Sequence, residues 1–239
     1  MTSPSKLTHI SAASLEALPS RIAYLRQFID FTASDAAALH AAAPVIGPLV
    51  PAVVDAVYTK LLSFDITAAA FVPRQTGFAG EAPADIRDLS HSHPQIKFRK
   101  DFLARYLAKL VALDYESPES WEYLDKVAVM HTGKAGFAHR AKKPALRVEY
   151  IHCAILLGFV EGILVDAVMG HPDLDTPTKT AVLRAVNKIL WIQNDLFARH
   201  YITDAAAVAA TKVVLDKSVA ATAVLGLIAA GAVLARFLL

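Results

Sequence analysis

The sequence predicts an all-α fold, and three observations support this prediction. Apolar residues recur at helical spacing in several stretches, and no convincing alternating strand pattern lies between them. Helix start signals precede some of these stretches, such as Thr176 before Pro177. At 239 residues the chain has room for one ordinary domain and an appendage, or at most two small domains. No internal repeat is found.

Composition narrows the class of protein. Hydrophobic residues make up 55% of the chain, and the mean hydropathy of +0.40 is high for a soluble domain, which indicates apolar residues beyond an ordinary core. A net charge of +2 gives no basic surface for DNA or RNA, so no nucleic acid partner is expected. The single Cys153 fits a reducing compartment. Because the first residues lack the apolar centre of a secretory signal, this part is expected to stay in the cytosol.

The first residues are predicted to form a tail, followed by two helical segments. Residues 1–18 are polar without a period, and apolar residues from Ile22 to Phe31 follow at helical spacing. Thr32 and Asp35 resemble a capping box for an Ala-rich helix to Ala43.

A further helix is expected after Pro44, Pro48 and Pro51. It should begin between residues 46 and 53 and run to about residue 63. Tyr58 lies among its apolar positions, so its side chain should point inward. It is either a core phenol bonded to backbone or a residue that faces a ligand.

The middle of the chain combines a long loop with an amphipathic helix. Residues 72–94 are rich in Pro, Gly and polar residues, and His91 and His93 there are read as exposed loop residues. From residue 96 to 111 apolar and basic residues fall on different sides of a helix, with Phe102 on the apolar side.

The next helix carries the most informative histidine. Trp121, Leu124, Ala128 and His131 recur at steps of three, four and three, after a start signal at Ser117. Gly133 and Gly136 supply a stop. The imidazole therefore points inward, where it is either a satisfied core residue or a buried ligand.

The last part of the chain contains two long helices and an apolar tail. Val148 to Met169 is mostly apolar, but its charged residues favour a core helix over a membrane span. Thr176 starts a helix to about Tyr201. Residues 219–235 carry no charge and with their neighbours approach the length of a bilayer, which resembles a tail anchor; a buried or partner-binding helix is the alternative.

These boundaries give four segments. Residues 1–18 form the tail, 19–203 the domain, 204–217 a linker and 218–239 the membrane anchor. The chain is thus expected to face the cytoplasm and to be held on a membrane by its tail, with a soluble cytoplasmic protein as the alternative.

No nucleophile elbow, P-loop, H-E-x-x-H or repeated C-x-x-C motif is present, so common hydrolase, NTPase and zinc sites lose their usual sequence support. An all-helical domain with an inward histidine, an inward tyrosine and aromatic residues between them suits haem.

Four segments of the chain resemble protoglobins and the sensor globins of globin-coupled sensors, over about residues 31–202. They are F-T-A-S-D (31–35), D-A-V-Y (55–58), F-R-K-D-F (98–102), and W-E-Y-L-D-K-V-A-V-M-H-T-G-K (121–134) followed by V-E-Y-I-H-C-A-I-L-L-G-F-V (148–160). The resemblance implies a globin-like fold, which the apolar C-terminal helix then follows in this sequence. One departure is Val57, where protoglobins commonly carry a tryptophan.

The resemblance also implies roles for individual residues. His131 becomes the proximal iron ligand of a haem b, and Tyr58 faces the distal side. Phe102 lies over the haem, with Phe98 one turn earlier as a competitor. Further candidate pocket walls are Leu62, Tyr150, Ile151, Ile155 and Trp191. A homodimer through the last two globin helices is likewise implied.

The leading hypothesis is therefore a haem globin that reversibly binds O₂, CO or NO as a sensor or carrier. A hydrogen bond from Tyr58 to bound O₂ would contribute about 1–3 kcal/mol. The alternatives are a haem-free, tail-anchored helical adaptor and a haem enzyme acting on peroxide or nitric oxide. No catalytic acid in the sequence favours the enzyme.

Overall fold

The computed structural model describes residues 7–75, 77–137 and 147–202. Within these ranges the regular structure is helical, and the bridge between Thr132 and Arg147 is the one strand-like pairing. The chain divides into two compact units, Met1–Ala198 and Arg199–Leu239, and the account below concerns the first. The predicted anchor over residues 218–239 lies outside the described residues.

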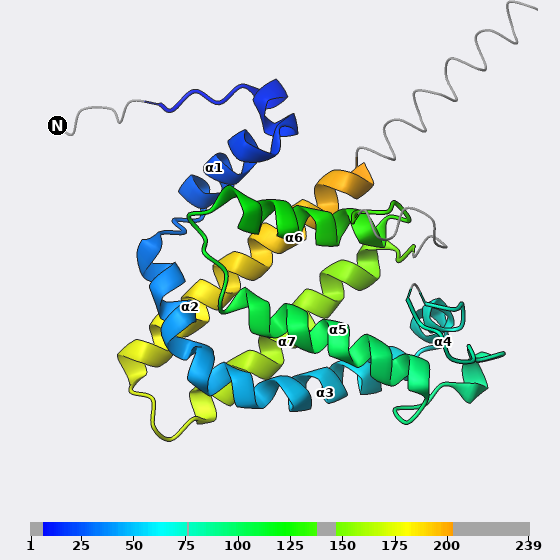
Figure 1. Cartoon of the computed structure of the whole chain (residues 1–239). Helices are drawn as coiled ribbons and strands as arrows, with labels where there is room; N and C mark the ends of the chain where they lie inside the picture. The colour runs from blue at the N-terminus through cyan, green and yellow to red at the C-terminus, as the bar shows by residue number, and fades with distance from the viewer. Residues whose placement is uncertain (1–6, 76, 138–146, 203–239) are drawn as a thin grey trace, which may run out of the picture. The chain divides into compact units, whose positions relative to one another are not determined.

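Figure 1 shows the helices of this all-α domain in chain order. Their bounds are α1 Leu18–Phe28, α2 Ala33–Ile46, α3 Val50–Leu62, α4 Asp65–Ala68, α5 Pro94–Leu110, α6 Pro118–His131 and α7 Tyr150–Gly170. A last helix begins at residue 176 and is described through residue 202. Short 3-10 turns occupy Ala12–Glu16, Gly47–Leu49, Ala69–Phe71 and Ile86–Asp88.

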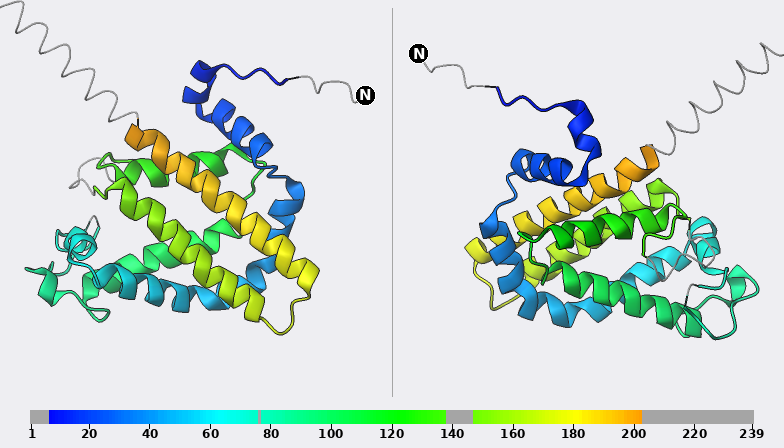
Figure 2. Two further views of the ribbon diagram at one scale, coloured as in Figure 1. Left: turned by 180° about the vertical axis from the view of Figure 1, so that it is seen from behind. Right: turned by 45° about the horizontal axis from the view of Figure 1, so that its top comes forward.

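α5 and α6 pack against different helices. α3 packs along α5 and α7, whereas α6 packs on α1, and α5 and α6 make few direct backbone approaches. Seen from behind in Figure 2, α7 and the helix over residues 176–198 run side by side. Asn187 joins them by donating to Glu161 at 2.6 Å.

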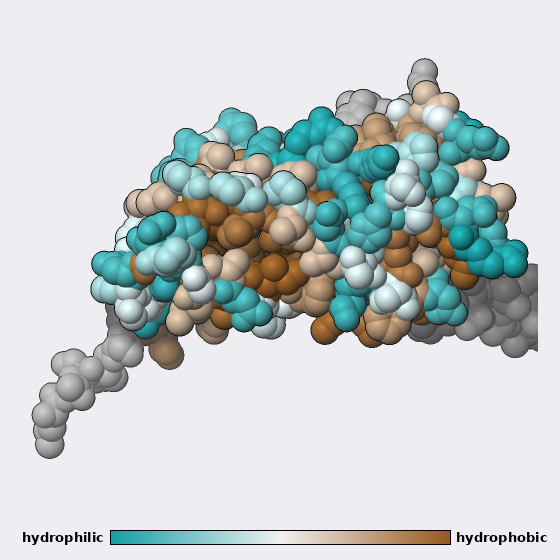
Figure 3. Space-filling view, turned by 90° about the horizontal axis from the view of Figure 1, so that it is seen from below, coloured by the Kyte–Doolittle hydropathy of each residue, from teal (hydrophilic) through white to brown (hydrophobic). Residues whose placement is uncertain are grey.

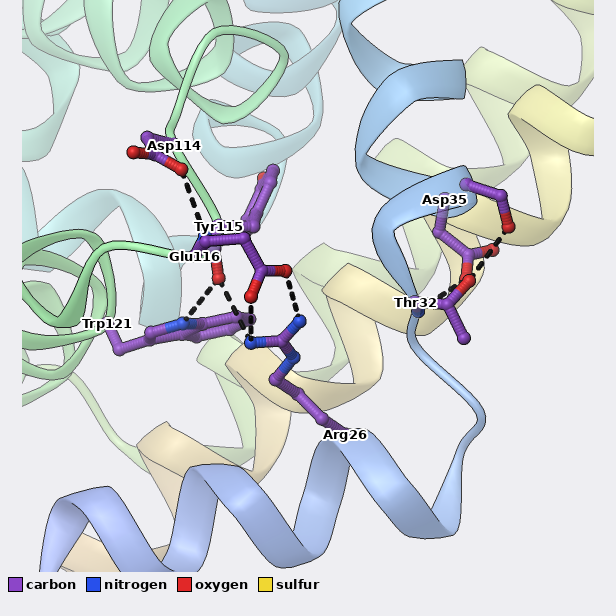
Figure 4. Close-up of polar contacts among 8 residues, drawn as sticks. Arg26, Thr32, Asp35, Asp114, Tyr115, Glu116 and Trp121 are labelled. Carbon is purple, nitrogen blue, oxygen red and sulfur yellow. Dashed lines mark hydrogen bonds and ion pairs between the residues drawn. The ribbon is translucent and has the colours of Figure 1, made fainter.

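Helix ends agree with the sequence signals at several points and differ at others. The Thr32 N–H donates to the Asp35 carboxylate at 2.8 Å, which confirms the back-bonding of the predicted capping box (Figure 4). α3 begins at Val50, inside the predicted range. α2, however, continues through Pro44 to Ile46, three residues past the predicted end. A proline in the last turn removes only one of the helix's own hydrogen bonds.

Asp35 also ties α2 to the last helix. Lys188 Nζ donates to its carboxylate at 2.9 Å. Burial by itself would raise the pKa of Asp35, but the Thr32 N–H and the Lys188 ammonium outweigh burial and hold this pKa below its usual range.

A cluster around Arg26 fixes α6 against α1, as Figure 4 shows. The guanidinium lies 5.8 Å from the Trp121 ring centroid and 5.9 Å from that of Phe31. Trp121 Nε1 donates to the Tyr115 carbonyl at 3.0 Å, and Arg26 donates to the same oxygen at 3.2 Å. Since one carbonyl receives both donors, the amino-terminal half of α6 has a defined position.

Aliphatic side chains of five helices form one part of the core. It encloses a cavity of about 30 Å³ lined by aliphatic residues of α2, α3, α5, α7 and the last helix, including Leu39, Leu110, Leu164 and Ile189. None of the predicted site residues lines it. An apolar void of this kind stays dry, because water finds no polar partner in it.

Apolar surface is also present outside the core. In Figure 3, hydrophobic side chains gather between polar ones on the face seen from below. Two described stretches, Ala33–Leu62 and Tyr150–Gly170, are long and apolar enough to cross a membrane by length and composition alone. Core helices of soluble proteins meet the same criterion, so length and composition alone do not make these two stretches membrane spans.

Candidate functional site

His131 is the last residue of α6, and its helix is positioned as its spacing predicts. Trp121 is 4% exposed, and Leu124 and Ala128 are fully buried, so the apolar stripe faces the core. His131 itself is partly buried. The helix stops immediately after it, and Gly133 has a φ of 91°, a conformation that favours glycine.

The His131 ring is oriented by its own helix. Its Nδ1 lies 2.8 Å from the Val127 carbonyl oxygen. Because a carbonyl can only accept, Nδ1 carries the proton, and the neutral imidazole then has its lone pair on Nε2. The Phe197 ring stands perpendicular to the imidazole, at 5.2 Å between centroids. This arrangement gives Nε2 the electronic form of a metal ligand.

Tyr58 lies on α3 in a buried aromatic environment. Its residue is 4% exposed, and its ring packs on Phe71 with centroids 5.6 Å apart. Burial raises the pKa of the Tyr58 phenol, while the charge and hydrogen bonding of Arg99 act in the opposite direction. The phenol is therefore neutral at physiological pH and keeps a proton to donate.

α5 presents two phenylalanines one turn apart. Phe98 and Phe102 meet edge to face at 4.9 Å, and Phe78 packs on Phe98 at 5.6 Å. Phe102 is 43% exposed, so part of its side chain is not covered by protein, although the Arg105 guanidinium carbon lies 4.9 Å from its ring centroid. Both rings offer a flat apolar surface.

Arg99, between these phenylalanines, is a residue that the sequence did not single out. Its guanidinium carbon lies 4.7 Å from the centroid of Phe71, the ring that also packs on Tyr58. Its Nη1 donates to the Gln75 side-chain oxygen. Gln75 is held in place because its own N–H donates to Gln95 Oε1 at 3.0 Å.

Comparison with known proteins decides the family. A family model described as Protoglobin matches residues 18–207, which is well over half of the chain. The chain belongs to the protoglobin family. No curated protein matches the chain.

This membership confirms the predicted family and the all-α, globin-like fold. Protoglobins are haem-binding globins, so a haem and a gas ligand are implied for this chain at the level of the family. Family membership does not identify the iron ligand or the gas. The geometry of His131 and Tyr58 bears on both.

The remaining predicted wall residues of this protoglobin lie in different places. Leu62 and Tyr150 are half-buried, and the Tyr150 hydroxyl donates to Asn194 at 3.1 Å, which joins α7 to the last helix. Ile151, Ile155 and Trp191 are 67%, 69% and 57% exposed. On α7, Ile151 and Ile155 lie opposite the buried Cys153 and Val160, so the site proposed below does not use them.

The two loop histidines have local partners. His93 Nδ1 accepts from the Gln95 N–H at 3.1 Å and thereby caps α5. His91 lies 2.7 Å from Lys100 Nζ and 3.2 Å from the Thr59 hydroxyl. His93 therefore caps the start of α5, whereas His91 links α5 to α3.

The residues of this protoglobin fit a haem better than a metal ion held by protein alone. Among the described residues, no group of three or more His, Cys, Asp or Glu side chains could hold a metal ion. A porphyrin supplies four nitrogens itself and needs one strong protein ligand, which His131 Nε2 can provide. The flat, partly uncovered Phe102 ring suits a planar group.

Proposed function

We propose that this protoglobin is a b-type haem protein that reversibly binds a diatomic gas, with His131 as the protein ligand of the iron. One observation carries the assignment of His131: its Nδ1–H is committed to the Val127 carbonyl at 2.8 Å. Metal-ligating histidines use their other nitrogen in this way, which fixes the ring and raises its basicity.

The chain's own residues would set what the site binds. Haem supplies an iron atom with an open coordination position for a gas. Tyr58, buried and protonated, is the donor for a hydrogen bond to a polar gas ligand. Phe98 and Phe102 supply apolar ring surface on α5. The hydrogen bond raises the affinity for O₂ relative to that for CO, because bound O₂ accepts the stronger hydrogen bond.

A visible spectrum tests this proposal. Purified wild-type protein should show a Soret band, and His131→Ala should lose or greatly weaken it. His171→Ala is the matched control, because His171 lies in the turn after α7, where its Nδ1 accepts from the Asp173 N–H at 3.3 Å. A folded wild type that takes up no haem would leave the helical adaptor as the better account.

We also propose that two copies pair through α7 and the last helix. The outward side of α7 carries exposed residues at alternating steps of four and three: Ile151, Ile155, Gly158, Gly162, Val165 and Met169. A Cβ added at Gly158 or Gly162 would meet nothing within 4 Å, so a partner's backbone could approach closely there. Trp191 on the adjoining helix adds a large exposed ring, of the type enriched in interfaces.

Substitution of this surface tests the dimer. The double variant Ile155→Glu with Trp191→Glu should have the molar mass of a monomer by light scattering, under conditions where the wild type has that of a dimer. Ile66→Glu is the control, since Ile66 is equally exposed on α4 and outside the proposed interface. A monomeric wild type would contradict the proposal.

Attachment of the chain to a cytoplasm-facing membrane through residues 218–239 is a third proposal, supported by the uncharged run over residues 219–235. Full-length protein should partition with membranes, and a chain ending at residue 204 should be soluble. Equal solubility of the two would contradict it.

A further inference from the structure

Arg99 brings a positive charge to the ligand side of the proposed site. Arg99 and Tyr58 both contact Phe71: the guanidinium carbon is 4.7 Å from its ring centroid, and the Tyr58 ring centroid is 5.6 Å from it. Arg99 also influences Tyr58 directly, because its charge and hydrogen bonding work against the rise in the Tyr58 pKa. The cation and the phenol therefore belong to one cluster.

The charge of Arg99 is not neutralised within the part of the chain that the structure describes. No ion pair there joins Arg99 to a carboxylate, and its contact through Nη1 is to the neutral amide of Gln75. Its Nε is buried and has no hydrogen-bond partner there. The adjacent Lys100 differs, because its Nζ pairs with Asp55 at 2.7 Å.

A buried donor without a partner is costly, and a guanidinium offers five N–H groups in a planar fork. A small anion beside Tyr58 could accept from this fork and from the phenol together. Charge-assisted hydrogen bonds of this type are roughly twice as strong as neutral ones.

We propose that Arg99 raises the affinity of the gas site for small inorganic anions, such as azide, and leaves its affinity for neutral ligands such as CO nearly unchanged. This inference rests on the proposed haem function and names a determinant of specificity within that site. Tyr58 alone would favour any polar ligand, whereas Arg99 adds a preference for negative charge.

Ligand titration of the haem-loaded protein tests this role. Azide is titrated into the ferric form and CO into the ferrous form, for wild type, Arg99→Leu and Arg99→Lys. Arg99→Leu should weaken azide binding by about tenfold to a hundredfold, the worth of one charge-assisted hydrogen bond. CO affinity should change little, and Arg99→Lys should recover part of the azide affinity because it keeps the charge.

The control is Lys97→Leu, which removes the same charge from an exposed position of α5. Should Arg99→Leu fail to fold, Arg99→Gln removes the charge while keeping a polar side chain. An azide affinity that is unchanged in the haem-loaded variant, or an equal loss for azide and CO, would overturn the inference while leaving the haem function standing. A wild type without haem would overturn both.

Discussion

The Nδ1–H of His131 donates to the Val127 carbonyl, one turn earlier on α6, at 2.8 Å. The acceptor is a backbone atom, so substitution of the Val127 side chain leaves this contact in place. The imidazole is thus oriented by the helix that carries it, and Phe197 supports it at 5.2 Å from the side. This preorganisation leads to the first prediction.

Replacing His131 with glycine should separate iron ligation from packing. His131→Gly removes the ring and leaves a space beside Phe197, so haem should bind weakly by itself and be restored when free imidazole is added. The measurement is the Soret absorbance as a function of imidazole concentration. Absence of rescue in a folded variant would argue that His131 only fills space.

Tyr58→Phe should accelerate loss of O₂. The substitution keeps the aromatic contact with Phe71 and removes the one hydroxyl. Dissociation of O₂ should become about tenfold to a hundredfold faster, while CO dissociation changes much less. Flash photolysis measures both. Equal effects on the two gases would place Tyr58 in a packing role.

Asp35→Asn should destabilise the fold in a pH-dependent manner. The pKa of Asp35 is lowered in the folded protein, so its contribution is present above the unfolded pKa of about 3.9 and is lost as pH falls through the folded pKa. The free energy of unfolding of the variant should be about 1–3 kcal/mol lower than that of wild type near pH 7. This difference should become smaller in acid.

Urea unfolding at several pH values measures the effect of Asp35→Asn. Asp166→Asn on the exposed side of α7 is the matched control. A difference in unfolding free energy that stays the same at every pH, including pH values below the pKa of Asp35, would contradict the ion pair with Lys188.

Leu124→Ala should reduce stability through a core cavity. Leu124 is fully buried on α6, and truncation of such a leucine costs about 2–5 kcal/mol. The exposed Ile66→Ala should stay within about 0.5 kcal/mol of wild type. Thermal unfolding compares the two, and equal effects would contradict the buried placement of Leu124.

Local signals were sufficient where one helix decides its own boundaries. The start of α6 after Ser117, its stop before Gly133 and the inward stripe that ends in His131 follow from spacing and from backbone preferences within a few residues. The back-bonded Asp35 is another case, because both partners lie within one turn. Such features need no knowledge of the tertiary fold.

Other features depend on contacts that sequence spacing does not encode. α7 is apolar almost all round, so periodicity could not tell the exposed Ile151 and Ile155 from its buried residues. Helical spacing places Arg99 on the basic side of α5, and its contacts with Phe71 and Gln75 join residues more than twenty positions apart in the chain. Only the fold brings these groups together.

Gln193, on the last helix, joins α5 to α6. It accepts from the Tyr106 hydroxyl of α5 at 3.0 Å and donates to the Leu124 carbonyl of α6 at 3.4 Å, and it is fully buried. One amide can meet both partners only over a narrow range of spacings between α5 and α6. Any separation of α5 from α6 must therefore break a buried hydrogen bond, at a cost of about 1–3 kcal/mol.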